Sequence, residues 1–449
     1  MDMHTAARAG GRTAAVTAGR RAGEDGTTWT AGKARNWAGN LSFHAASVHR
    51  PESVAELSTV VATHERVKAV GSGYSFSAVA DTRGALVRLD RMPRTIEIDT
   101  VRSQVRVAAG ITFAELAPHL HERGFALPNL GSLPHISVAG ACATGTHGSG
   151  NGNRSIAAGA RAVEFVVADG TLTRICSSSP RFDGVATSLG ALGVATHLTF
   201  DLVPAYEVEQ YVWEGLDWEG LVRDVDAITA CAYSVSVFTD WYGYHSVWAK
   251  RRVGDPLPDL SFTGAHPADG PRHPLVGMAT DNCTPQEGAP GAWWERLPHF
   301  RADRTPSVGE ELQSEYFVPL DRARDALRAV RGLRERIGPL LHLSELRTQA
   351  GERTWLGHDR DSLAIHFTWR ADPVGVGRVL PAVEAALAPF SPRPHWGKLF
   401  DVAPERLAPR YPRWEEFRAL RADLDPAGTF SNKLTDRYFA ACRQRPGRR

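Results

Sequence analysis

The segment Val67–Phe76, VKAVGSGYSF, carries the main indication of how this chain folds. Its first four residues are typical of a short strand, and Gly71 and Gly73 then interrupt the apolar run. Glycines so close together permit positive φ angles and let the backbone approach another group closely. The segment predicts a strand followed by a loop against a ligand or a neighbouring segment. The glycine pair alone does not complete the dinucleotide fingerprint G-x-G-x-x-G.

Short strands and helices alternate around this segment. Ser53 and Thr112 each begin a capping box, which predicts a helix after each of them. A strand is expected near 86–89 and a hairpin over 95–107. Because hairpins are too frequent for a doubly wound parallel sheet, the predicted fold class is α+β.

The segment 127–152 is composed mainly of small and hydroxyl residues without a sustained period. We expect it to be a surface loop or backbone that lines a ligand. The apolar pattern then predicts further strands, over 163–168, 171–175 and 196–202.

The second half of the chain differs in composition, because aromatic residues become frequent after about Pro204. Its periodicity predicts strands over 313–317, 342–348 and 363–369, and helices over 322–337 and 374–388. That order is typical of a layered α+β unit and predicts a second domain. The tail is expected to return to short helices.

Composition limits the function classes. The length of 449 residues favours two or three domains. A net charge of +2 gives no indication of nucleic-acid or anionic-membrane binding, and no run of 18 apolar residues predicts a membrane span. Five widely spaced cysteines without C-x-x-C favour a reducing compartment, so we expect a cytoplasmic location. Residues 1–28 lack the apolar part of a signal peptide and are expected to be a disordered leader.

Two stretches place polar residues at alternating positions. Glu345 and Arg347 lie two apart in LSELRT, and His366 and Thr368 repeat that spacing in IHFTW. In a strand, such residues share one face about 7 Å apart. The set suits recognition of hydroxyl groups. The alternative interpretation is a solvated face with an incidental ion pair.

Lys398 and His147 are further candidates. Lys398 lies among aromatic residues in PHWGKLF, where a lysine often extends its charge to the surface. His147 in TGTHGS has a structural or capping role as its alternative. No single one of these motifs decides the function.

Further blocks lie in order along the chain: Asn36–Asn40 (NWAGN), Gly71–Phe76 (GSGYSF), Leu127–Gly140 (LPNLGSLPHISVAG), Ala143–Ser149 (ATGTHGS), Thr187–Val194 (TSLGALGV), Tyr233–Trp241 (YSVSVFTDW), Leu297–Phe300 (LPHF), Glu311–Tyr316 (ELQSEY), Glu345–Thr348, His366–Trp369, Pro394–Phe400 and Leu424–Asn432. Together they closely resemble the vanillyl-alcohol oxidase flavoproteins, the PCMH-type FAD family, and within it the alditol oxidases, near the aldonolactone oxidases. The resemblance covers the chain from Arg35 to Asn432.

The resemblance implies a two-domain PCMH-type FAD-binding fold with an inserted α+β substrate (cap) domain. Residues 29–203 and the returning tail 399–449 would bind FAD, and residues 204–398 would bind substrate. The loop 69–75 would wrap the FAD pyrophosphate, because backbone N–H groups at closely spaced glycines can face anionic oxygens. The implied FAD contacts are Ala69, Val70, Gly71, Ser72, Gly73, Tyr74, Ser75, Ser132, Ser137, Gly140, Thr144, Gly145, Thr146, His147 and Val194.

The same resemblance implies that the polar strand face is the substrate site. The positions that match polyol-binding residues are Ser132, Glu345, Arg347, Thr368 and Lys398. Glu345, or water organised by Arg347 and His366, would remove the hydroxyl proton. Lys398 would stabilise the anionic reduced flavin, so these four residues are the implied catalytic set, and no metal is implied. Gly131 matches a position that leaves room for dioxygen, which favours an oxidase.

Tyr74 departs from the resemblance. In the alditol oxidases, a histidine at this position carries the flavin covalently. The tyrosine excludes a histidyl link, so FAD is expected to bind tightly but non-covalently. The alternatives are a tyrosyl ether at Tyr74 and a thioether to Cys142. Without the covalent link, a lower flavin potential and slower alcohol oxidation are expected, which would suit a modified sugar alcohol or an aminocyclitol as substrate.

The expected activity is the FAD-dependent oxidation of the terminal primary alcohol of a polyol or polyol-like sugar to the aldehyde. Hydride would pass to flavin N5, and dioxygen would reoxidise the flavin and yield hydrogen peroxide. One alternative is a flavin dehydrogenase or aldonolactone-type oxidase with another electron acceptor, and another is a redox-silent flavoprotein. The expected partners are a small polyol or modified sugar and dioxygen, bound by a monomer.

Overall fold

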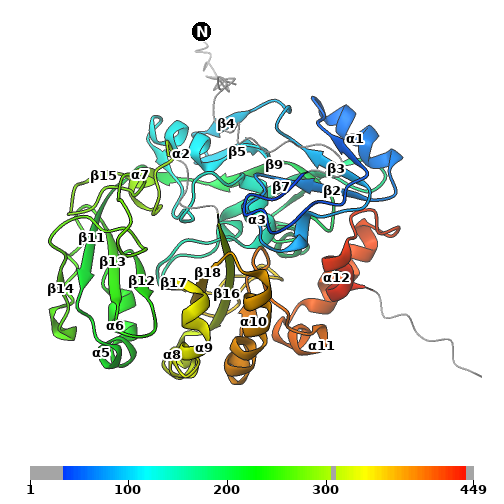
Figure 1. Ribbon diagram of the computed structural model, residues 1–449. Coiled ribbons are helices and arrows are strands. Elements are labelled where there is room, and N and C mark those ends of the chain that lie inside the picture. The colour runs from blue at the N-terminus through cyan, green and yellow to red at the C-terminus, as the bar shows by residue number, and fades with distance from the viewer. Residues whose placement is uncertain (1–33, 305–309, 441–449) are drawn as a thin grey trace, which may run out of the picture.

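The computed structural model describes residues 34–304 and 310–440 of the chain. Its sheets are mainly antiparallel, and helices lie beside them in separate layers (Figure 1). The predicted α+β class is confirmed. The leader predicted over residues 1–28 lies outside the described residues.

Strand β2 (Val67–Val70) opens the Val67–Phe76 segment as predicted, and it ends where the glycine loop begins. Helix α1 (Val54–Thr63) supplies the crossover that a parallel sheet requires, and Ser53 caps its N-terminus. The sheet has three parallel strands in the order β1-β3-β2, spanning Ser47–His49, Ala85–Arg88 and Val67–Val70.

A second sheet contains the predicted hairpin. Helix α2 (Phe113–His121) follows it, and the Glu115 carboxylate accepts the Thr112 backbone N–H as the capping box predicts. The sheet has five antiparallel strands in the order β4-β5-β9-β7-β8, spanning Ile96–Asp99, Gln104–Ala108, Val194–Asp201, Ala160–Val166 and Leu172–Cys176. All five strands correspond to predicted ones.

Helix α3 (Val138–Thr144) lies within the segment 127–152, so a surface loop is wrong for these residues, whereas backbone that lines a ligand stays a prediction. The helix is a single short run of small residues, VAGACAT, and therefore shows no amphipathic period in the sequence. Tertiary packing stabilises it, because Val138 and Cys142 are buried in the core. Gly145 ends the helix in the left-handed region, at φ 70°.

The largest sheet has the order β14-β11-β13-β12-β17-β18-β16-β19, with β15 paired to β11. The predictions located β16, β17 and β18 but missed β11, β12 and β13, although SVSVFT in β12 alternates as a strand does. In that order its strands span His266–Pro267, Glu207–Glu214, His245–Arg252, Ser234–Thr239, Leu341–Gln349, Ser362–Arg370, Glu311–Pro319 and Arg393–Pro394, and β15 spans Gly291–Ala292.

Helices cover one face of this sheet. The apolar side chains Val237, Leu346 and Ile365 share a core with residues of these helices. Because successive side chains of a strand point to opposite faces, the neighbours of these residues, Glu345 and His366 among them, face the other way. The predicted helix over 322–337 is divided in two. The helices are α5 (Trp218–Arg223), α6 (Val225–Ala230), α8 (Ala323–Arg331), α9 (Arg334–Ile337) and α10 (Pro373–Leu387) (Figure 1).

After Lys398 the chain returns to its N-terminal half. The Asn432 side-chain amide donates to the carbonyls of Ala78 and Val79, at 3.0 and 2.9 Å. The Val67 N–H donates to the Thr429 carbonyl at 2.8 Å. The helices of this tail are α11 (Pro404–Leu407), α12 (Trp414–Leu424) and α13 (Lys433–Phe439). The division into domains at 203/204 and 398/399 stays a prediction.

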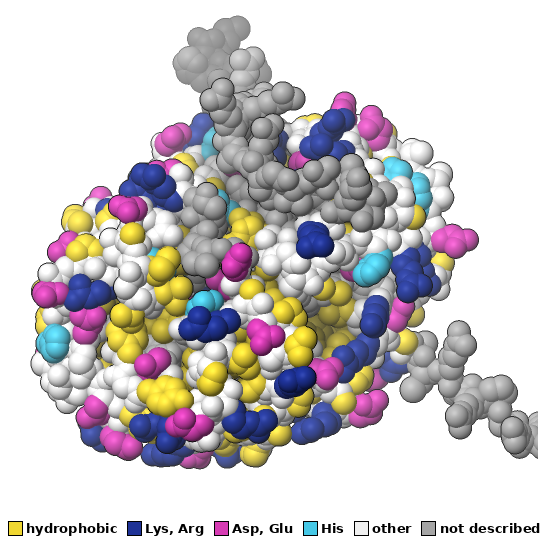
Figure 2. All heavy atoms as spheres, in the orientation of Figure 1, with side chains coloured by type: hydrophobic (Ala, Val, Ile, Leu, Met, Phe, Trp, Pro, Cys, Tyr) yellow, Lys and Arg dark blue, Asp and Glu magenta, His cyan; other side chains and the backbone are white. Residues whose placement is uncertain are grey.

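On the face shown in Figure 2, basic and acidic side chains are interspersed, in keeping with the near-neutral net charge. None of the helices within the described ranges combines the length and the apolar character that a bilayer span requires. The remaining short strands and α-helices are β6 (Phe125–Ala126), β10 (Val203–Pro204), α4 (Phe182–Val185) and α7 (Trp293–Arg296).

Candidate active site

Three neighbouring strands place carboxylates and an imidazole side by side on the sheet face opposite the helices. The register sets His366 on β18 directly opposite Glu315 on β16 and Glu345 on β17. Such partners have Cβ atoms about 4.5–5.5 Å apart and share one face. Thr368 on β18 likewise lies opposite Gln313 on β16. The sheet therefore presents a row of polar groups, Glu315–His366–Glu345, which we call the polar row.

Two cations bind this polar row. Arg347 donates to Glu315 (Nη2 to Oε1, 2.7 Å) and to the Ser132 hydroxyl at 3.3 Å. Lys398 donates to the other Glu315 oxygen at 2.6 Å, and its Nζ lies 3.3 Å from His366 Nδ1. The structure therefore brings together the predicted substrate and catalytic residues, Ser132, Glu345, Arg347, His366, Thr368 and Lys398.

Burial decides between the alternatives that the sequence left open. Glu345 is 7% exposed and Arg347 4%, so the interpretation as a solvated ion pair is wrong. The Lys398 side chain is 13% exposed, and its amine is bonded to Glu315 rather than extended to the surface. His147 is buried, and its Nδ1 lies 2.7 Å from the Gly148 carbonyl.

Both carboxylates of the polar row are ionised. Burial alone would raise the pKa of Glu345, but the charges of Arg347 and the contact with His299 outweigh it and hold that pKa well below its usual range. Burial likewise opposes the ionisation of Glu315, whereas Lys398 and Arg347 hold its pKa well below the usual value. Two carboxylate charges thus stand against two cations in a buried site.

His366 is neutral between these charges. Burial first, and then the Lys398 charge, lower the pKa of His366 to about 3. Its Nε2 lies 3.4 Å from the Thr368 hydroxyl. A neutral imidazole can both donate and accept a hydrogen bond, which suits contact with a hydroxyl group.

The glycine loop 69–75 lies against the Lys398 segment. The Phe76 N–H donates to the Gly397 carbonyl at 2.7 Å, and the Ser77 hydroxyl donates to the Trp396 carbonyl at 2.6 Å. The structure therefore places the loop predicted to bind FAD next to the segment that carries Lys398.

The residues around this loop fit a large anionic cofactor. A Cβ atom at Gly71 would lie 2.1 Å from Ser137 Oγ, and one at Gly140 would lie 2.8 Å from the same atom. Among the described residues, the backbone N–H groups of Gly71, Ser72 and Gly73 donate to no protein acceptor, so they can serve phosphate oxygens. Glycines that let the backbone approach closely, together with N–H groups that have no protein acceptor, suit the binding of an FAD pyrophosphate.

The other predicted FAD contacts continue from this loop to the polar row. Ser137 precedes α3, and Thr144 ends that helix, with its hydroxyl 3.0 Å from the Gly140 carbonyl. His147 follows, and its Nε2 lies 3.3 Å from Glu315 Oε1, within ion-pair distance but without a hydrogen bond. Val194 begins β9 and is buried.

Four residues of this site were not predicted from the sequence. Gln313 and Glu315 repeat the two-residue spacing of Glu345 and Arg347, and that repeat on a third strand was a usable signal. His299, which contacts Glu345 at 2.8 Å, and Lys250, which contacts His299 at 3.1 Å, have no such pattern.

His147, Glu315 and His395 bring possible metal ligands within 4.8 Å of one another. Glu315 is already bonded to Arg347 and Lys398, so a metal cation there would be repelled by two positive charges. We therefore assign the Glu315 carboxylate to these two cations rather than to a metal.

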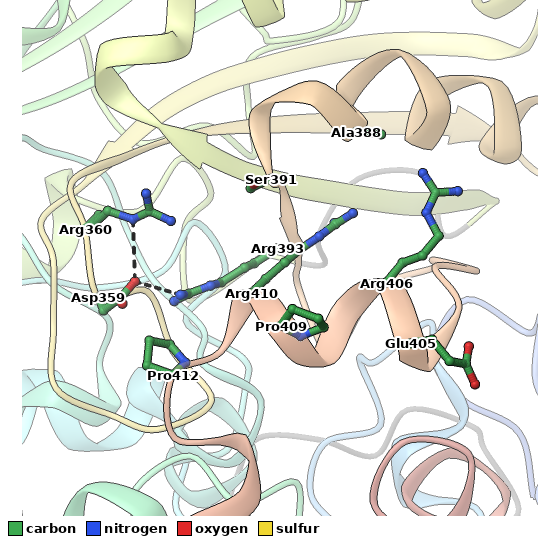
Figure 3. Close-up of a pocket in the computed structure, with 10 residues that line it drawn as sticks. All are labelled: Asp359, Arg360, Ala388, Ser391, Arg393, Glu405, Arg406, Pro409, Arg410 and Pro412. Atoms are coloured by element: carbon green, nitrogen blue, oxygen red, sulfur yellow. Dashed lines mark ion pairs between the residues drawn. The ribbon is translucent and has the colours of Figure 1, made fainter.

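A separate pocket of about 430 Å³ lies at the C-terminal end of α10 (Figure 3). None of its lining residues belongs to the predicted site. Asp359 pairs with Arg393 at 2.7 Å, and Arg410 donates to the Pro392 carbonyl. Cations near a helix C-terminus are favourable, so these arginines have a structural explanation.

Comparison with known proteins agrees with this geometry. A family profile described as "FAD binding domain" matches residues 45–175, and one described as "D-arabinono-1,4-lactone oxidase" matches residues 308–438. An alditol oxidase from a Streptomyces species is 50% identical over 404 residues, which cover 88% of this chain and 96% of that protein. This chain belongs to the alditol oxidase family. It is an FAD-dependent oxidoreductase that acts on CH–OH donors with oxygen as the acceptor.

This alditol oxidase family member has more distant relatives. An L-gulono-1,4-lactone dehydrogenase from Mycobacterium tuberculosis is 28% identical over 435 residues, which cover 90% of this chain and 98% of that protein. A xylooligosaccharide oxidase from Myceliophthora thermophila C1, solved with xylobiose, has a TM-score of 0.72 at 14% identity and covers 91% of this chain and 93% of its own. Cholesterol oxidase from B. sterolicum gives 0.72 at 15% identity, with 90% and 96% covered. These structures support the fold alone, and they confirm the predicted FAD-oxidase fold.

Proposed function

We propose that this enzyme oxidises the terminal primary alcohol of a polyol, or of a polyol-like sugar, to the aldehyde. The observation that carries the proposal is the polar row Glu315–His366–Glu345 with its two cations, buried beside the glycine loop. Fixed donors and acceptors that converge in a buried site suit a ligand with several hydroxyls. The similarity to an alditol oxidase supports the same substrate class.

Each residue of the site has a proposed part. The ionised Glu345 accepts the hydrogen bond of the reacting hydroxyl and takes its proton, while neutral His366 and Thr368 contact neighbouring hydroxyls. Because Arg347 lowers the basicity of Glu345, alignment contributes more than base strength. Lys398 supplies positive charge beside the substrate, balanced by Glu315. The proposed substrate-binding residues are Ser132, Glu345, Arg347, Thr368 and Lys398.

When bound, FAD supplies the hydride acceptor and then passes two electrons to dioxygen, which is reduced to hydrogen peroxide. The proposed cofactor contacts are supported by the close approach of Gly71 and Gly140 to Ser137 and, among the described residues, by the N–H groups of residues 71–73, which have no protein acceptor. The residues that would hold the cofactor are Ala69–Ser75, Ser132, Ser137, Gly140, Thr144–His147 and Val194.

The test of this function is a bleaching screen. The FAD-loaded enzyme is mixed without oxygen with xylitol, sorbitol and aminocyclitols, and loss of the flavin colour identifies a substrate. Hydrogen peroxide formed under air then distinguishes an oxidase from a dehydrogenase. A flavin that no polyol or polyol-like sugar bleaches would contradict the proposal.

FAD is expected to leave the protein on acid precipitation, so that the yellow colour stays in the supernatant. Two observations support non-covalent binding. Tyr74 stacks on Trp37 with 5.1 Å between ring centroids, and Cys142 is 1% exposed, where burial raises the pKa of its thiol and disfavours a reactive thiolate. Colour retained in the pellet would contradict this expectation, and mass spectrometry of the Tyr74 and Cys142 peptides would then locate the bond.

Replacing Gly131 with valine is expected to slow hydrogen peroxide formation while anaerobic bleaching by a polyol continues. A Cβ at Gly131 would meet the Thr146 methyl carbon at 3.4 Å, an ordinary contact, so a Cβ atom fits there, and the valine methyl groups would extend into the space proposed for dioxygen. The control is Gly152→Val, since a Cβ there meets no atom within 4 Å. Equal losses of both reactions in Gly131→Val would show that Gly131 does not control access of oxygen.

We further propose a cytoplasmic monomer with an FAD domain of residues 29–203 and 399–449 and a substrate domain of residues 204–398. The cysteines within the described ranges are all free, which supports a reducing compartment. Light scattering on the purified protein measures the oligomeric state.

A further inference from the structure

A buried lysine and a buried histidine lie next to Glu345. The lysine is on β13, and in the sheet order β13 and the strand that precedes Lys398, β19, lie on opposite sides of β17. Lys250 on β13 donates to the carbonyls of Leu297 and Pro298, at 2.5 and 3.2 Å. Its Nζ also lies 3.1 Å from His299 Nδ1, and His299 Nε2 lies 2.8 Å from Glu345 Oε1. The three side chains form one buried chain of contacts that ends on the proposed proton acceptor.

The chemistry of the lysine decides which nitrogen of His299 carries the proton. Nε2 of His299 faces a carboxylate oxygen, which only accepts, so Nδ1 accepts from Lys250, and the three N–H groups of an ammonium match the three contacts of Nζ. Burial first, and then the Lys250 charge, lower the pKa of His299 to about 4, so the imidazole is neutral. Its single proton therefore lies on Nε2, where it is donated to Glu345.

We propose that Lys250 and His299 are a positioning pair, in which Lys250 selects the His299 tautomer whose Nε2–H orients the Glu345 carboxylate and keeps it ionised. This inference deepens the proposed function and rests on it. Neither residue lies in the polar row, and the pair acts on the substrate only through Glu345.

The contacts of Glu345 explain why its orientation matters. Oε1 is bonded to His299, whereas Oε2 lies 3.6 Å from Arg347 Nε and 3.8 Å from His366 Nδ1. These contacts fix the orientation of the carboxylate, with Oε1 toward His299 and Oε2 toward Arg347 and His366. Oε2 is the oxygen available to a substrate hydroxyl.

The surroundings hold the imidazole in place. The rings of Phe238 and Trp248 pack edge to face against His299, each with 5.4 Å between centroids. The Ser236 hydroxyl lies 3.4 Å from Nε2. The charged or titratable groups that face the pair are Glu345 and Arg347 from β17 and Cys283 from the segment before α7, and His366 from β18 lies 3.8 Å from Glu345.

A second buried lysine shows what is particular to Lys250. Lys68 on β2 is equally buried and also donates to two backbone carbonyls, those of Leu189 and Gly190 at 3.0 Å. Burial lowers the pKa of each lysine to about 7. Lys250 alone of the two contacts an imidazole, and the nearby Glu345 carboxylate supports its charge. Lys68 thus provides a matched control for the loss of a buried lysine.

The first experiment reads the tautomer directly. The FAD-loaded enzyme is labelled with ¹⁵N-histidine, and the His299 signals are identified as those lost in His299→Gln. We expect one neutral tautomer protonated on Nε2 in the wild type and in Lys68→Met, and a shift toward the Nδ1–H form in Lys250→Met. An unchanged His299 spectrum in Lys250→Met would overturn the proposal. This measurement needs no turnover, so it still decides the tautomer if no polyol reduces the flavin.

The second experiment follows anaerobic flavin reduction against pH. In His299→Leu, the Glu345 carboxylate loses a hydrogen bond, so its pKa should rise. The acidic limb of the profile of limiting rate against pH is then expected to move to higher pH by about 1–2 units. The limiting rate should fall more than KM rises. His299→Gln, whose amide N–H replaces Nε2–H, should restore most of the wild-type profile. A His299→Leu profile that matches the wild type would overturn the proposal, and the two His299 variants decide it if Lys250→Met fails to fold.

Discussion

Replacing Glu345 with glutamine is expected to slow the reduction of the bound flavin by a polyol by about 10²–10⁴-fold, the contribution typical of a positioned acid–base group. The amide is neutral and cannot take the hydroxyl proton, and its NH₂ group cannot accept a hydrogen bond as the second carboxylate oxygen does. FAD content should stay the same, because the proposed cofactor contacts lie on other segments. Stopped-flow absorbance without oxygen, at saturating polyol, measures the effect.

Glu384→Gln is the matched control for this variant. Glu384 is a half-buried carboxylate that accepts the Tyr316 hydroxyl at 2.9 Å and the Asp401 N–H at 2.7 Å, away from the polar row. An amide oxygen can accept both bonds, so the rate should change little. A Glu345→Gln enzyme that reduces its flavin as fast as Glu384→Gln would remove Glu345 from the proposed mechanism.

Replacing Glu315 with leucine is expected to lower the free energy of unfolding by about 3–5 kcal/mol and to abolish polyol oxidation. Glu315 is fully buried and binds both Arg347 and Lys398, so its removal leaves two buried cations without their shared counter-charge. Glu315→Gln keeps an acceptor oxygen and should cost less. Urea unfolding of the FAD-loaded enzymes gives the difference.

The pH dependence of this loss has a definite sign. Because the pKa of Glu315 is held well below 4.5 in the folded protein, its ionised form contributes stability above pH 4.5. That stability is lost as the pH falls through the folded pKa, so the gap between wild type and Glu315→Leu should narrow in acid. Glu405→Gln, on an exposed carboxylate of α11, should change stability by less than about 0.5 kcal/mol. A Glu315→Leu protein as stable as Glu405→Gln would contradict the proposed charge balance.

Much of the site was visible in the sequence because strand periodicity is local. The two-residue spacing of Glu345 and Arg347, and of His366 and Thr368, predicted one shared polar face, and the pairing of β17 with β18 confirms it. The same spacing in Gln313 and Glu315 was overlooked. The glycine loop after β2 was predicted from backbone freedom alone.

The remainder depends on contacts that no local pattern encodes. Whether Glu345 and Arg347 were solvated or buried was decided by segments distant in the chain, such as the Ser132 loop that covers Arg347. His299 comes from an irregular segment and Lys250 from a strand that was not predicted, and only tertiary packing brings them to Glu345. Helix α3 escaped prediction because its residues are too small to show a period.

The central claim is that the polar row holds a polyol by its hydroxyls while the terminal carbon of that polyol transfers a hydride to bound FAD. The most direct measurement is the rate of anaerobic flavin bleaching by the polyol that the screen selects, compared with the same polyol deuterated at its terminal carbons. We predict bleaching by both, with the deuterated polyol clearly slower, because the carbon–hydrogen bond breaks in that step. Bleaching at equal rates, or no bleaching by either, would contradict the account.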